Sequence, residues 1–88
     1  MVEVNLEALL SEFFEKAEDF IAEPSLTKGL DLDELTGQAS SACSSRFGTG
    51  SGLVGRFFDF MKAIPRQDLG ELQRLLDEIR TLLSRLRQ

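Results

Sequence analysis

The last twenty residues constrain the fold most, because they carry the apolar pattern of an amphipathic helix. Leucine or isoleucine recurs in steps of three and four, which is the a and d spacing of three heptads, at Leu69, Leu72, Leu76, Ile79, Leu83 and Leu86. Asp68 caps this predicted helix, and Glu71 completes a capping box. Leu75 and Leu82 add a third apolar row, which is wider than the seam of a two-stranded coil. The pattern therefore predicts a helix over 68–87 that packs against several other helices.

Helical spacing of apolar residues predicts three more helices, over 6–22, 32–46 and 53–64. Asn5 is a good N-cap for the first helix, and Pro24 ends it. Residues 24–30 then read as a connector that contains Pro, Ser, Thr and Gly. Asp31 caps the second helix, with Glu34 completing a capping box. We expect the second helix to have a lower helix propensity than the first, because it contains glycine and several serines.

A glycine-rich loop over 48–52 precedes the third helix, and Pro65 ends that helix. The third helix is apolar on two faces, with Phe57, Phe60, Met61 and Ile64 on one and Val54 and Phe58 on the other. Such a helix must be covered on more than one side. It is therefore either the centre of the fold or half of an interface with a partner.

The fold class expected from these segments is all-α, in one domain over residues 1–88. A chain of 88 residues buries roughly 60–65% of its unfolded surface, which permits a single modest core. Four helices with short connections form most simply a compact antiparallel bundle. The main alternative is an open helical hairpin that completes its core by dimerisation, because the apolar faces of the helices are larger than a short chain can easily bury by itself.

Charge is unevenly distributed along the chain, whose net charge is −5. Residues 1–34 hold ten acids and two lysines, whereas residues 35–88 hold eight basic and five acidic residues. The acidic balance disfavours nucleic-acid binding, which depends on neutralising phosphates. The asymmetry is compatible with attraction between the two halves, between two chains, or towards a basic partner.

The sequence also indicates a compartment. Its one cysteine, Cys43, excludes an internal disulfide, and a lone thiol suits a reducing environment. Glu3 and Glu7 stand where a secretory leader would be basic, and no apolar run approaches the ~20 residues of a membrane span. We expect a cytoplasmic or otherwise intracellular protein without a membrane span. Cys43 is predicted to be a small core residue, and the alternative is a reactive thiol near Arg46.

Catalytic and metal chemistry is not expected. The chain lacks histidine and tyrosine, and these residues with cysteine supply most acid–base groups, nucleophiles and zinc ligands. Asp31, Asp33 and Glu34 suggest calcium, but an EF-hand loop needs an oxygen ligand and a glycine where Leu35 and Thr36 stand. We therefore predict no enzyme activity, no cofactor and no metal.

Within the glycine-rich segment 48–55, residues 50–55 formally match the glycine pattern of dinucleotide-binding loops, but the context is missing. The segment lacks the preceding strand of a dinucleotide site, and Arg56 stands where a P-loop would have lysine. A hinge followed by a helix start, with Ser51 as N-cap, explains these residues. The alternative is an anion site at the helix N-terminus, formed by Gly50, Ser51, Gly52 and Arg56.

The function expected from these features is a non-enzymatic protein–protein interaction module, such as a small adaptor, assembly factor, chaperone-like subunit or inhibitor. Its partner is a protein, with a second copy of the chain among the candidates. Aromatic residues and methionine are enriched at interfaces, so the candidate contact residues are Phe14, Phe57, Phe58, Phe60, Met61, Leu75 and Leu82. For the aromatic cluster the competing interpretation is plain core. The alternative function is a module that binds a small anionic ligand or nucleotide at 48–55.

Overall fold

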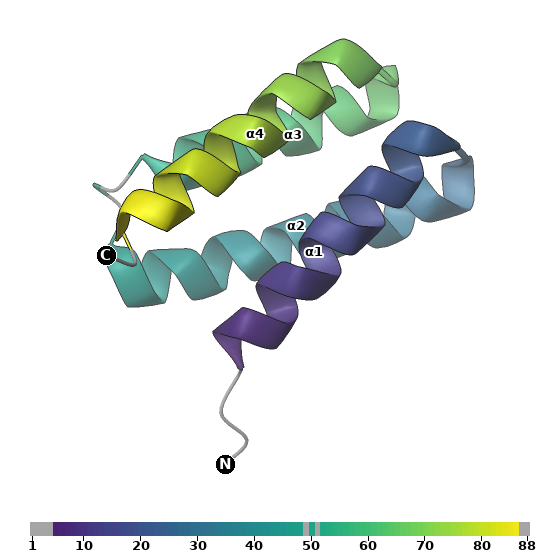
Figure 1. The fold of residues 1–88 in the computed structure, drawn as a ribbon. Helices are drawn as coiled ribbons and strands as arrows, with labels where there is room; N and C mark the ends of the chain where they lie inside the picture. The colour runs from purple at the N-terminus through teal and green to yellow at the C-terminus, as the bar shows by residue number, and fades with distance from the viewer. Residues whose placement is uncertain (1–4, 49, 51, 87–88) are drawn as a thin grey trace.

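The computed structural model describes residues 5–48, 50 and 52–86, and that part of the chain contains four helices and no strand. They are α1 (Leu6–Ala22), α2 (Leu26–Phe47), α3 (Leu53–Arg66) and α4 (Leu69–Leu86). Successive helices run in opposite directions, so that α1 with α2 and α3 with α4 form two hairpins (Figure 1). The predicted all-α bundle is confirmed.

The two middle helices hold the bundle together. Helix α2 packs against both α1 and α3, and α3 also packs against α4, whereas the contact between α1 and α4 is smaller than these three. The radius of gyration is 12.3 Å, close to the ~12 Å expected of a compact chain of this length. An ion pair between Arg80 on α4 and Glu18 on α1 joins the acidic N-terminal half to the basic C-terminal half.

Phe13 on α1 lies at the centre of the core. Its ring packs edge-to-face against Phe57 and Phe60 on α3, with both centroid distances 5.3 Å. Helix α4 covers this cluster with five buried side chains, Leu72, Leu75, Leu76, Ile79 and Leu83. The wide apolar stripe of the last helix is therefore largely covered by the chain itself.

Helices α1 and α4 begin directly after the predicted N-cap residues. The Asn5 side chain accepts a hydrogen bond from the Ala8 N–H, and the Asp68 side chain accepts one from the Glu71 N–H, each at 3.2 Å. Helix α1 has the predicted bounds, and α4 begins at Leu69. The Glu71 carboxylate pairs with Arg74 on the next turn. The predicted last position of this helix, 87, lies outside the described residues.

Helix α2 begins six residues earlier than predicted, so the expected connector over 24–30 and the cap at Asp31 are wrong. Ser25 is the N-cap, and its hydroxyl accepts a hydrogen bond from the Lys28 N–H at 3.2 Å. Asp31 and Glu34 are exposed residues within the helix. Gly29, which resembles a break in the sequence, is instead buried inside the helix, where α2 approaches its neighbours closely.

Helix α3 continues past Pro65, which was expected to end it, and stops at Arg66. A proline disfavours helical geometry in the residue before it, but that residue, Ile64, is held in the core with 4% of its surface exposed. Gln67 ends the helix in the left-handed region, with φ 51°, and its N–H donates to the Ile64 carbonyl at 3.0 Å. Gly52 occupies the N-cap position. The predicted cap, Ser51, lies outside the described residues.

Candidate functional site

Large exposed apolar side chains gather beside the junction of α2 and α3. Leu26 and Leu30, one turn apart on α2, are 79% and 66% exposed, and Phe58 on α3 is 51% exposed. A fourth, Leu86, is 37% exposed at the end of α4. Single exposed apolar residues are normal, but a contiguous group marks an interaction surface.

A hollow of about 270 Å³ lies between the first turns of α2 and the last turns of α3. Leu26 and Leu30 line it from α2, and Met61 and Pro65 line it from α3. Phe58 stands one turn before Met61 on the same side of α3. These five residues, Leu26, Leu30, Phe58, Met61 and Pro65, are called the α2–α3 surface below.

The absence of a side chain at Gly29 determines the floor of this hollow. Because Gly29 has no side chain, α2 approaches Phe20 and Ile64 so closely that an added Cβ would lie 3.2 Å from one and 3.4 Å from the other. All three residues line the hollow. The close approach leaves the neighbouring Leu26 and Leu30 on the outer side of α2.

The outer wall comes from the second apolar row of α3. Val54, Phe58, Met61 and Pro65 follow one another in steps of four and three, parallel to the buried row that contains Phe57 and Phe60. The buried row faces Phe13. The second row remains partly or largely exposed beside α2. Of the two apolar faces predicted for α3, one therefore packs in the core and the other lies at the surface.

Charged residues flank the α2–α3 surface, acidic on α2 and of both signs on α3, where the exposed Asp59 follows Phe58. Asp33 lines the hollow from α2, and Glu34 follows it on the same helix. Lys62 and Arg66 lie on α3 next to Met61 and Pro65, and all five charged residues are exposed. Ion pairs within the described residues involve other side chains, such as Lys28 with Asp19 and Arg56 with Glu78.

The structure separates the predicted contact residues into three groups. Phe57, Phe60 and Leu75 are buried in the core and do not reach the surface of this conformation. Phe14, Met61 and Leu82 are half-buried, and Phe58 is the most exposed of the seven. The Phe14 ring is covered in part by the Arg80 guanidinium, whose central carbon lies 4.9 Å from the ring centroid.

The sequence pattern does not identify Leu26 and Leu30 as surface residues. The pattern assigns both to a connector, where an apolar side chain has no defined direction. The available signal was Ser25 directly after Pro24, since serine is a preferred N-cap and could have extended the helix backwards. With that start, Leu26 and Leu30 fall on one helical face.

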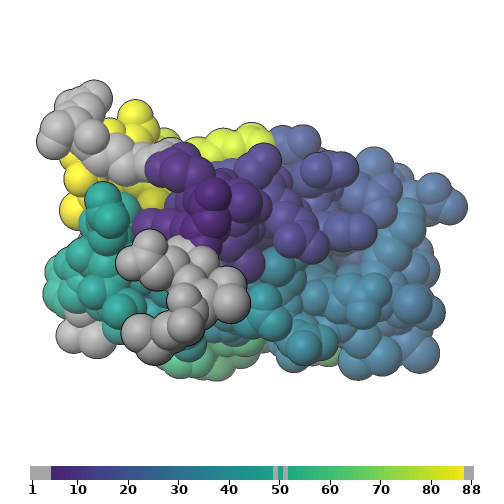
Figure 2. All heavy atoms as spheres, turned by 90° about the horizontal axis from the view of Figure 1, so that it is seen from below, coloured from purple at the N-terminus to yellow at the C-terminus, as the bar shows by residue number. Residues whose placement is uncertain are grey.

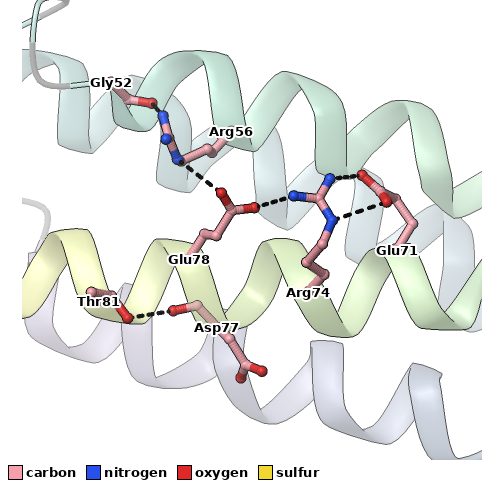
Figure 3. Close-up of polar contacts among 7 residues, drawn as sticks. All are labelled: Gly52, Arg56, Glu71, Arg74, Asp77, Glu78 and Thr81. Atoms are coloured by element: carbon pink, nitrogen blue, oxygen red, sulfur yellow. Dashed lines mark hydrogen bonds and ion pairs between the residues drawn. The ribbon is translucent and has the colours of Figure 1, made fainter.

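The proposed anion-site residues lie around the start of α3, except Ser51, which is outside the described residues. Gly50 is exposed and Gly52 is the N-cap. The Arg56 guanidinium is turned to partners within the chain, as Figure 3 shows: it donates to the Gly52 carbonyl at 3.1 Å and its Nε lies 3.8 Å from the Glu78 carboxylate. This arrangement does not favour an anion site built on Arg56.

A second hollow, of about 370 Å³, lies between α3 and α4 and includes Arg56, Arg74 and Arg85 in its lining. Arg74 pairs with both Glu71 and Glu78, and Asp77 also lines the hollow. The proximity of Glu71 raises the pKa of the Arg74 guanidinium. Because carboxylates accompany the arginines, the hollow has no strong excess of positive charge.

A third hollow, of about 860 Å³, opens between α1 and α2. Figure 2 shows the face of the molecule that these two helices form. Leu6 and Leu9 line the hollow from α1, and its α2 side consists mostly of small residues, among them Gly37, Ser41 and Ala42. It is more open and less apolar than the hollow between α2 and α3, so it offers little to anchor an apolar partner.

Cys43 lies in the core with no exposed surface. Burial raises the pKa of the thiol from 9.0 to about 11, because the thiolate would lose its hydration there. The predicted core position is confirmed, and at neutral pH the buried side chain is the protonated, unreactive form.

We expect the folded protein to react with an aromatic disulfide reagent only when Cys43 becomes exposed by opening. At pH 7 to 8 the reaction should take place at once in concentrated urea and much more slowly in buffer. Raising the pH towards 9 should accelerate the reaction of both states, because the thiol that opening exposes ionises near its ordinary pKa of 9.0, and the folded protein should remain slower than the unfolded protein. Equal rates in buffer and urea would contradict the buried position.

Among the described residues, no group of three or more His, Cys, Asp or Glu side chains is placed to hold a metal ion. None of the described helices is long and apolar enough to cross a membrane. In comparisons with known proteins, no family model, curated protein or solved structure matches the chain.

Proposed function

We propose that the chain is a non-enzymatic protein–protein interaction module that binds a protein partner through the α2–α3 surface. The observation that carries this proposal is the exposure of Leu26 and Leu30 at an apolar hollow, with the exposed Phe58 one turn along α3 from Met61, which lines the hollow. The partner supplies a helix whose apolar face fills the hollow. The small size of the chain and its rigid helical frame suit an adaptor, assembly factor, chaperone-like subunit or inhibitor.

The chemistry of the surface supports a protein partner in particular. Leucine, phenylalanine and methionine on two adjacent helices form the kind of groove into which an amphipathic helix lays its apolar residues. The charges at its two edges would orient that helix. Since a lone buried thiol suits a reducing compartment, the proposal places this function in the cytoplasm or elsewhere inside the cell.

A displayed library of helical peptides tests the proposal, because it samples many apolar faces at once and requires no identified partner. Peptides selected on the wild-type protein are then measured against a variant with Leu30→Glu and Phe58→Glu. Because both changes place a carboxylate in the apolar contact, we expect binding to weaken by at least roughly tenfold. The selected peptides should have apolar residues at helical spacing.

The control variant carries Ser11→Glu and Ser84→Glu, which add the same charge at exposed positions on α1 and α4. It should bind the selected peptides as the wild type does. If the library yields no peptide, or if the peptides bind all three proteins equally, the α2–α3 surface is not a binding site and the proposed function fails.

A further inference from the structure

We draw no further inference here: the strongest candidate, the α2–α3 surface with its exposed Leu26, Leu30 and Phe58, already carries the proposed function, and nothing in the structure shows what covers it.

Discussion

Replacing Phe13 with alanine is expected to lower the free energy of unfolding by about 3–5 kcal/mol. The ring has no exposed surface and contacts Phe57 and Phe60 of α3 at centroid distances of 5.3 Å. Its removal leaves a cavity where the α1–α2 hairpin meets the α3–α4 hairpin. Because a small domain has only about 5–15 kcal/mol of stability, the loss should be visible as a large shift of the urea midpoint followed by circular dichroism.

Phe58→Ala is the matched control for this prediction. It removes the same atoms from the same type of residue, but from a side chain that is 51% exposed. We expect it to cost less than about 1.5 kcal/mol, since only part of the side chain leaves an apolar environment. The comparison is made at low protein concentration so that self-association does not contribute. Similar losses for the two variants would show that Phe13 is not the centre of the core.

Helices α1 and α4 could be predicted from sequence almost to the residue because their local signals agree. Each has an apolar stripe of helical period and a side-chain cap directly before it, Asn5 for one and Asp68 for the other. Such agreement between pattern and capping leaves little choice of boundary.

The start of α2 could not be fixed in the same way, because two cap candidates compete. Asp31 with Glu34 is the stronger local motif, and Ser25 has glycine four residues after it. The structure uses Ser25 because Gly29 in a helix allows close packing against Phe20 and Ile64. That gain comes from residues distant in sequence, so no local pattern contains it.

The candidate surface was partly predictable for a similar reason. Two apolar faces on α3 indicate that one is in the core, but periodicity alone does not tell which. The choice is made by Phe13, which packs against Phe57 and Phe60 and leaves Phe58 outside. Leu26 and Leu30 became surface residues only with the earlier start of α2.

Replacing Gly29 with glutamine should lower the free energy of unfolding by about 1–3 kcal/mol. This is the opposite of the usual effect, because replacing a glycine inside a helix normally stabilises the helix. An added Cβ lies 3.2 Å from the Phe20 ring and 3.4 Å from the Ile64 side chain, so a longer side chain must separate α2 from α1 and α3. The buried amide would also need hydrogen-bond partners in an apolar site. Thermal and urea unfolding measure the loss.

Gly55→Gln is the matched control. Gly55 lies in the first turn of α3, is exposed, and has nothing within 4 Å of an added Cβ. There the same substitution should raise the stability by a few tenths of a kcal/mol, up to about 0.8, through helix propensity alone. Opposite signs at the two glycines would establish that Gly29 is required for close packing. A gain at both would mean that α2 can move outward at little cost, and that the floor of the α2–α3 hollow is not fixed by the core.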